Sequence, residues 1–600
     1  MADSKYIVGI DLGTTNSVVA YCLIPQEASE PSEINIFAIP QLVDAGSMNE
    51  QETLPSFIFQ PGENDVSDGA LELPWDKSMS HAVGEFARNR GAEIPNRLIA
   101  SSKSWLCHTG VDRNAPILPW DCPDESAKRS PVQATADILT HIRSAWNNRF
   151  AKDDDNLVLE NQEILLTVPA SFDAVARDLT VKASDMAGLQ NITLLEEPQA
   201  AFYAWLAQKG DSWRDEIAVG DRILVCDVGG GTTDFSLIQA SEIDGELNLE
   251  RVAVGDHLLV GGDNMDIALA HVVAQKVSDQ GQKLNAWQMR GLWQSCRQAK
   301  EQLYDNSKKR SYPITILGRG SSLIGGTIES KLTRDDLNNN ISEGFFPLCD
   351  KDQEPLQFKR VGMRKMGLEY TSDPAITHHL AKFLRKNADS GEVGYPTVVL
   401  FNGGVMKSQV LRKKTMESIA SWQESNHIRE LTNQNFDLAV ARGAVYYGMA
   451  RHGKGIRIRA GLNQTYYIGI EPSLPAVPGM EMPVKYLCLA PFGMEEGTGE
   501  EITGQNFGLI VGEPVKFDLY ASNTRKQDTI GSFAENNIDD ILPVTSMETH
   551  LEMEKNNDGT MIPIHLHVSA TEIGTLEVSC VSDESDQKWK LAFNVREEEV

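Results

Sequence analysis

The stretch Ile223–Ile238, ILVCDVGGGTTDFSLI, decides the fold of this chain of 600 residues. Its apolar beginning predicts a buried strand that delivers Asp227 to its end, and its last four residues predict a returning strand. Between the strands lie Gly229, Gly230 and Gly231. Because glycine lacks a Cβ, backbone N–H groups of such a loop can close around phosphate oxygens. The stretch therefore predicts a phosphate-binding hairpin.

Polar side chains flank the three glycines of this hairpin. Asp227 supplies negative charge for Mg²⁺ or for its water shell, and the hydroxyls of Thr232 and Thr233 can donate to phosphate oxygens or orient a water molecule. A single glycine turn between two strands is more often an ordinary hairpin. The phosphate-binding interpretation therefore depends on a second observation.

That observation is a second copy of the pattern near the N-terminus, in VGIDLGTTNSVVA from Val8 to Ala20. Asp11 corresponds to Asp227 of the first stretch, and the small polar turn consists of Gly13, Thr14 and Thr15. The spacing is far too wide for a solenoid repeat, so it indicates an internal duplication. Two homologous halves could clamp one nucleotide phosphate chain and its Mg²⁺ between them.

The two stretches resemble the phosphate signatures of the actin, hexokinase and Hsp70 ATPase superfamily, and specifically those of Hsp70-type, DnaK-like chaperones. The resemblance implies a duplicated α/β actin-like ATPase domain with two ribonuclease H-like lobes. It also implies ATP or ADP and Mg²⁺ as cofactors.

The same resemblance assigns roles to individual residues. Lys103, in the segment before a Trp-Leu pair, corresponds to the catalytic lysine of the family, and Glu197 to the acid beside the attacking water and the metal. Asp11 and Asp227 correspond to residues that hold Mg²⁺ through water, and Thr232 assists Lys103 at the γ-phosphate. Without the resemblance, a lone lysine is most often a surface residue, and the acid before Pro198 is an ordinary helix start.

A second group of residues matches the family's nucleotide contacts more loosely. The matching positions are Asp263, Lys300, Gly403, Gly404, Lys407 and Asp437. Helix capping alone would explain an aspartate after two glycines at residue 263. The family's acid-then-base order is reversed to Arg297 and Glu301, for which we expect an i,i+4 ion pair, and its small hydroxyl residue is Tyr304. These departures make the nucleoside contacts the least family-like part of the predicted site.

The composition of the chain changes near residue 451. Residues 1–450 form the predicted ATPase domain, 451–462 a basic, glycine-containing linker, and 463–600 a region of period-two apolar alternation. That alternation predicts an antiparallel β-sandwich that binds a substrate or a partner. Hsp70 linkers are acidic and leucine-rich, and complete Hsp70 proteins carry a helical lid, which we do not expect after this sandwich.

Charge and hydropathy restrict the partners. The net charge of −30 argues against nucleic acid, because phosphate contacts need clustered Lys and Arg. The sequence shows neither an apolar run of membrane-spanning length nor a signal-peptide core, so we expect a cytoplasmic protein without membrane contact. The eight cysteines contain no CxxC pair and are expected to be reduced.

The leading hypothesis is an Hsp70-like chaperone that hydrolyses ATP slowly to control polypeptide binding by the β-domain. Its expected partners are ATP and either unfolded polypeptide or one dedicated protein, with J-domain or nucleotide-exchange co-chaperones implied by the family. One alternative is a nucleotide-gated scaffold with little turnover. A small-molecule kinase of the same superfamily is a further alternative, but it would need a sugar pocket with its own catalytic carboxylate, which the sequence does not reveal.

Overall fold

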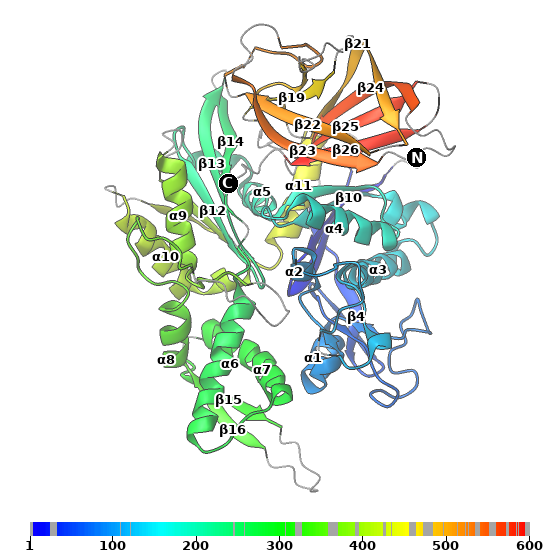
Figure 1. The fold of residues 1–600 in the computed structure, drawn as a ribbon. Helices are drawn as coiled ribbons and strands as arrows, with labels where there is room; N and C mark the ends of the chain where they lie inside the picture. Colours follow the sequence, from blue (N-terminus) through cyan, green and yellow to red (C-terminus); the bar gives the residue numbers. More distant parts are fainter. Residues whose placement is uncertain are drawn as a thin grey trace. The chain divides into compact units, whose positions relative to one another are not determined.

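The computed structural model contains two compact units, residues 1–457 and 458–600, shown in Figure 1. The structure describes residues 4–24, 33–108, 110–120, 122–243, 246–256, 258–306, 308–317, 327–357, 370–389, 395–423, 428–433, 435–454, 462, 464–471, 484–495, 497–512, 514–522, 524–525, 527–534, 540–550, 560–571, 575–583, 585 and 587–594. Most of the predicted linker, residues 455–461, lies outside these ranges. Among the helices of the described ranges, none is long and apolar enough to cross a membrane.

The first unit is mixed α/β and is built on two large sheets. The six-stranded sheet contains β1 (Tyr6–Leu12), β2 (Asn16–Leu23), β3 (Asn35–Ile36), β6 (Leu54–Pro55), β10 (Glu163–Val168) and β11 (Ile192–Glu196). The five-stranded sheet contains β12 (Arg222–Val228), β13 (Thr233–Ile243), β14 (Glu246–Val254), β17 (Val398–Asn402) and β18 (Arg429–Leu431).

The two sheets repeat one topology. In the first, the order is β11-β10-β1-β2-β3, and in the second it is β18-β17-β12-β13-β14. In each, an antiparallel hairpin (β1 with β2, β12 with β13) extends into a third antiparallel strand, while its first strand pairs in parallel with a later strand (β10 or β17). The duplication expected from the two glycine hairpins is therefore present in the strand pairing. It brings Asp11 and Asp227 to equivalent places near the ends of equivalent strands.

Helices cover both sheets. Those on or near the six-stranded sheet are α1 (Glu85–Glu93), α2 (Ser102–Leu106), α3 (Pro131–Phe150), α4 (Ala174–Met186), α5 (Glu197–Lys209) and α11 (Ala439–Arg451). The others are α6 (Gly262–Asp279), α7 (Ala286–Asp305), α8 (Arg334–Leu337), α9 (Ile376–Asp389) and α10 (Gln409–Ser421). Buried side chains of β12, β13, α6, α7, α9 and β17 form one continuous core around the five-stranded sheet. Such a core holds the ends of the strands in fixed positions.

Helices α5 and α11 pack closely against each other. A Cβ on Gly443 of α11 would overlap the carbonyl oxygen of Ala200 in α5, so only glycine permits this approach. Helix α5 begins at Glu197, directly after β11, with Pro198 in its first turn. The contact therefore fixes the helix whose first residue is one of the predicted catalytic groups.

Three small sheets complete the first unit. They consist of β4 (Ile39–Asp44) with β5 (Ser47–Gln51), of β7 (Ile58–Phe59) with β8 (Ala82–Val83) and β9 (Leu98–Ile99), and of β15 (Ser311–Ile316) with β16 (Ile328–Thr333). Figure 1 shows α6 and α7 side by side next to β15 and β16. Strand β9 leads directly into the segment that carries Lys103.

The second unit contains two four-stranded antiparallel sheets. One has the order β20-β19-β22-β23, from β19 (Thr465–Ile470), β20 (Lys485–Ala490), β22 (Pro514–Ser522) and β23 (Leu542–His550). The other has the order β21-β24-β25-β26, from β21 (Thr498–Val511), β24 (Thr560–Ala570), β25 (Thr575–Ser582) and β26 (Lys588–Asn594). Buried residues of both sheets contribute to one apolar core, and they alternate along the strands as the period-two pattern predicts.

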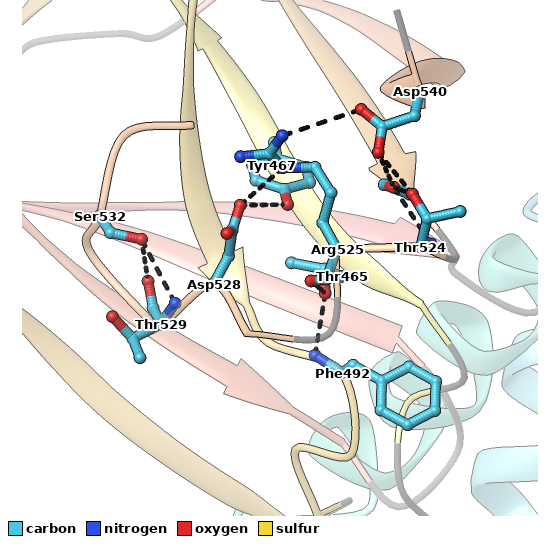
Figure 2. A network of polar contacts seen from close by, with 10 residues as sticks. Thr465, Tyr467, Phe492, Thr524, Arg525, Asp528, Thr529, Ser532 and Asp540 are labelled. Carbon is cyan, nitrogen blue, oxygen red and sulfur yellow. Dashed lines mark hydrogen bonds and ion pairs between the residues drawn. The ribbon is translucent and has the colours of Figure 1, made fainter. Parts of the chain in front are cut away.

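A polar network secures the loops of the first of these sheets, as Figure 2 shows. Asp528 accepts hydrogen bonds from Arg525 Nε at 2.8 Å and from the buried Tyr467 hydroxyl at 2.7 Å. The Thr465 hydroxyl donates to the carbonyl oxygen of Arg525 at 2.7 Å and accepts from the backbone N–H of Phe492 at 3.1 Å. The network joins three separate segments and uses buried polar groups that would otherwise be costly.

Candidate active site

A cavity of about 230 Å³ in the first unit collects residues from both large sheets. Most residues predicted from the sequence line it, namely Asp11, Gly13, Thr14, Thr15, Lys103, Glu197, Asp227, Gly229, Gly230, Thr232, Asp263, Lys300, Gly403, Gly404, Lys407 and Asp437. Gly231 and Thr233 are not part of its lining. The residues therefore meet in one place, although they come from segments far apart in the chain.

The two glycine hairpins approach each other closely at this cavity. A Cβ on Gly230 would collide with Thr15 Oγ1, and a Cβ on Gly231 would lie 3.1 Å from Thr14 Oγ1 and 2.5 Å from Ser104 Oγ. The turn is closed by a hydrogen bond from the N–H of Gly229 to the carbonyl of Thr232, at 2.9 Å. Glycine is therefore required by space at Gly230 and Gly231.

The side chain of Thr233 points away from the cavity. Strand β13 already begins at this residue, and its hydroxyl donates to the carbonyl oxygen of Val260 at 2.7 Å. Successive residues of a strand face opposite sides, so Thr232 and Thr233 cannot both face the same ligand. Of the two predicted threonines, the structure places only Thr232 at the cavity.

Each of the two duplicated aspartates is supported by the neighbouring parallel strand. Thr167 of β10 donates from its hydroxyl to Asp11 at 3.3 Å, and Asn402 of β17 donates from Nδ2 to Asp227 at 2.7 Å. The two donors occupy equivalent positions in the register, Asp11 opposite Thr167 and Asp227 opposite Asn402. Sequence reasoning missed both, because the two parallel strands share no motif. The internal duplication was the signal that could have found them.

Lys103 forms an ion pair with Glu197 inside the cavity wall. Burial opposes the charge of this lysine, but Glu197 and Asp11 outweigh it and raise the lysine pKa. The pKa of Glu197 is also raised, chiefly by desolvation and also by Asp234, against the lowering effect of Lys103. The pair thus places an ammonium group against a carboxylate whose charged form is destabilised by burial.

The pKa values of the other carboxylates at the cavity are also raised. Desolvation and the charge of Glu197 raise the pKa of Asp11 to about 7, and the same two causes raise the pKa of Asp227 well above its usual range. Asp234, which sequence reasoning missed, is buried nearby with a raised pKa caused mainly by desolvation, and it accepts from the N–H of Ser171 at 3.2 Å. One lysine does not neutralise this group of carboxylates.

Oxygen ligands with excess negative charge fit a hard divalent cation such as Mg²⁺, which usually keeps several of its waters. Among the described residues, no group of three or more His, Cys, Asp and Glu side chains converges closely enough to hold a metal directly. Asp11 and Asp227 are the lining residues that would hold such an ion.

The end of the cavity where the sequence predicts the nucleoside contacts, here called the nucleoside end, is lined by Asp263, Asp266, Arg297, Lys300 and Lys407 and has mixed charge. Arg297 does not pair with Glu301 on its own helix, as the i,i+4 spacing predicts; its guanidinium donates to Asp263 and, at 2.9 Å, to Asp266, both on α6. Lys300 contacts Asp266 at 2.7 Å. Arg297 pairs with Asp263 and Asp266 because both carboxylates are buried, where an unpaired charge costs free energy, whereas Glu301 is exposed to solvent.

Towards the outer part of this end, Lys407 pairs with Asp437 at 2.6 Å, and both side chains are more than a third exposed. Tyr304 and Phe436 provide aromatic surface in the lining. The guanidinium of Arg412 lies 5.3 Å from the ring of Phe436. The wall could therefore accept a planar ring, but its charged groups are already engaged with one another.

The Hsp70 protein family profile matches residues 7–355, more than half of the chain. The chain belongs to the Hsp70 family. The match covers both glycine hairpins, Lys103 and Glu197, but ends before the lining residues from Asn402 to Val440. The family also implies that the first unit has the actin-like ATPase fold.

Curated Hsp70 relatives agree with this assignment. The chain is 31% identical over 281 residues to the chaperone protein HscA homolog of Actinobacillus pleuropneumoniae serotype 5b (strain L20), covering 47% of this chain and 39% of the relative. It is 31% identical over 318 residues to the HscA homolog of Pseudoalteromonas atlantica (50% and 42% covered) and 28% identical over 288 residues to the chaperone protein DnaK of Stenotrophomonas maltophilia (46% and 39% covered). The chain thus spans about two fifths of the length of these relatives.

Proposed function

We propose that this Hsp70 family member binds ATP and ADP with Mg²⁺ in the cavity between its two sheets and hydrolyses ATP slowly to control polypeptide binding by the second unit. The observation that carries the proposal is the group of carboxylates with raised pKa values, Asp11, Glu197 and Asp227, beside Lys103. Such a group is stabilised by a cation.

In the proposed mechanism, backbone N–H groups of the two hairpins bind the phosphates. Bound Mg²⁺ would neutralise phosphate charge and help to fix the phosphate chain. Lys103 holds its ammonium group at the reacting end, where charge develops as the terminal phosphoryl group is transferred. Glu197 orients the attacking water, and Thr232 donates its hydroxyl to a phosphate oxygen. The ion pair of Lys103 with Glu197 keeps both groups in place before nucleotide arrives.

We further propose that residues 1–450 act as two lobes that close on the nucleotide, that 451–462 link them to the second unit, and that 463–600 form a β-sandwich. Closure would bias the β-sandwich between states that bind polypeptide differently. Its partner would be unfolded polypeptide or one dedicated protein, with J-domain or nucleotide-exchange proteins as regulators. We also propose the cytoplasmic location that the sequence predicts.

The test is single-turnover ATP hydrolysis by the protein and by Lys103→Ala, each with and without an unfolded polypeptide. We expect slow hydrolysis that polypeptide stimulates, and a loss of about 10²-fold or more in the variant, the size seen when a group that stabilises transition-state charge is removed. ATP binding without hydrolysis and without a response to polypeptide would overturn the chaperone proposal. It would favour a nucleotide-gated scaffold for a dedicated partner instead.

A further inference from the structure

One buried contact joins the nucleoside end of the cavity to the segment that carries Lys103. Asp263, in the first turn of α6, accepts a hydrogen bond from Arg297 of α7 and another from the hydroxyl of Ser101, at 2.9 Å. Ser101 follows β9 and immediately precedes α2, two residues before Lys103. Helices α6 and α7 belong to the core of the five-stranded sheet, so the contact spans the two halves of the unit.

The surroundings of this contact make it strong. Arg297 and Asp263 are 7% and 2% exposed, so their hydrogen bonds are charge-assisted and shielded from water. The guanidinium also lies 5.6 Å from the ring of Phe57, which comes from the other half of the unit. Asp266 and Lys300 balance the remaining charges, giving two carboxylates and two cations.

Ser101 carries an unusual backbone. Its φ of 56° makes it the only non-glycine residue with positive φ in the part of the chain that the structure describes. A left-handed residue other than glycine costs free energy and persists only where its surroundings hold it. The hydrogen bond to Asp263 is such a restraint, and it acts at the start of α2.

We infer that Arg297, Asp263 and Ser101 form a positioning chain, which couples α7 to the segment of Lys103. An acid that binds the nucleoside at position 297 could not make this chain, because it would repel Asp263. Arg297 thus links the two halves of the unit through Asp263 and Ser101 in place of a nucleoside contact. The position of Lys103 is therefore coupled to the contact between the two halves. The consequence for catalysis rests on the proposed ATPase function, whereas the coupling itself does not.

The coupling is tested without nucleotide by hydrogen exchange of the amides of residues 101–106 in the full chain. Ser101→Ala removes the hydroxyl, and Arg297→Lys keeps the charge but loses the planar fork that spans Asp263 and Asp266. We expect each variant to speed exchange in this segment about tenfold, as loss of one hydrogen bond to a charged group implies. Ser102→Ala, which removes a neighbouring buried hydroxyl outside the chain, serves as the matched control and should leave exchange unchanged.

The double variant distinguishes a chain from two separate structural effects. If the residues act as one chain, Ser101→Ala adds little exchange in the Arg297→Lys background, because the link is already broken. Fold changes that multiply, or single variants that match Ser102→Ala, would overturn the inference. An unfolded variant would be seen as exchange throughout the molecule, and the other single variant would then carry the comparison with Ser102→Ala.

A kinetic measurement connects the chain to Lys103. In Ser101→Ala we expect the single-turnover rate constant to fall about tenfold while the affinity for ATP is unchanged, because a positioning residue that loses one charged hydrogen bond affects the reacting group and not the ligand. An unchanged rate constant in a variant with faster exchange would overturn the catalytic part of the inference. A wild-type protein that fails to bind ATP would overturn the proposed function, while the exchange experiment would still decide the coupling.

Discussion

Buried carboxylate charge is balanced differently at the two ends of the cavity. At the phosphate end, Asp11, Glu197 and Asp227 have raised pKa values and share a single lysine, so their charge is left for a ligand to balance. At the nucleoside end, desolvation also raises the pKa of Asp263, but Arg297 and Lys300 pair with Asp263 and Asp266 within the protein. The comparison teaches that binding energy for a nucleotide should come mainly from its phosphates and Mg²⁺.

The largest expected difference is between ligands. Mg·ADP at about 100 times its Kd should stabilise the first unit by about 2.7 kcal/mol, whereas adenosine at the same concentration should give almost no stabilisation. Thermal unfolding in the presence of each ligand measures the difference. Equal shifts for adenosine and Mg·ADP would reverse the comparison, since the nucleoside end would then carry the affinity.

Substitution of Gly230 tests the phosphate end directly. In Gly230→Ala the new methyl group collides with Thr15 Oγ1, and forcing a loop to accommodate such overpacking costs about 1–3 kcal/mol. We therefore expect the affinity for Mg·ADP, measured by calorimetry, to fall by at least about tenfold. Gly291→Ala in α7, whose Cβ would meet only the carbonyl of Ala92 at 3.6 Å, is the control and should bind normally.

Removal of the support for Asp227 should have a smaller effect. Asn402→Leu deletes the donor to Asp227 Oδ2, so the pKa of that carboxyl should rise further. We expect the apparent affinity for Mg²⁺, measured in single-turnover hydrolysis, to fall about tenfold, which corresponds to the loss of one charge-assisted hydrogen bond. Thr167→Val makes the equivalent change at Asp11, where the contact is 3.3 Å long. A larger effect at Thr167 than at Asn402 would contradict this ranking.

The smallest effect is expected at the outer nucleoside end. Lys407 and Asp437 form an ion pair in which both side chains are more than a third exposed, and such pairs contribute about 0–1 kcal/mol. Lys407→Ala should therefore change the affinity for ATP by less than about threefold and leave the unfolding temperature unchanged. A loss above tenfold would show that Lys407 contacts the base and that the nucleoside end contributes substantially to the affinity for ATP.

The sequence was most informative where backbone geometry restricts the residue type. The paired strand, aspartate and glycine pattern predicted the duplication that the two sheets display, because only glycine allows the hairpins to approach as Gly230 approaches Thr15. Strand alternation would also have shown that Thr232 and Thr233 face opposite sides.

The sequence was least informative where partners come from different segments. The i,i+4 rule considers one helix, and so it paired Arg297 with Glu301; the buried carboxylates that attract the guanidinium belong to α6, about thirty residues earlier in the chain. The positions of Thr167 and Asn402 beside the aspartates depend on the register of parallel strands, which no local pattern specifies. Tertiary electrostatics and register therefore escaped prediction.

The duplicated sheets also bear on the orientation in which a phosphate chain binds between them. Two equivalent hairpins, taken alone, would hold a phosphate chain equally well either way round. Lys103 and Glu197, at the start of α5, both belong to the first half and are buried, whereas the lysine–acid pair next to the start of α11 in the second half, Lys407 with Asp437, is more than a third exposed. Under the proposed function, the glycines of both hairpins bind the phosphate chain and the buried pair of the first half sets its orientation, so that only one end of the bound chain can react.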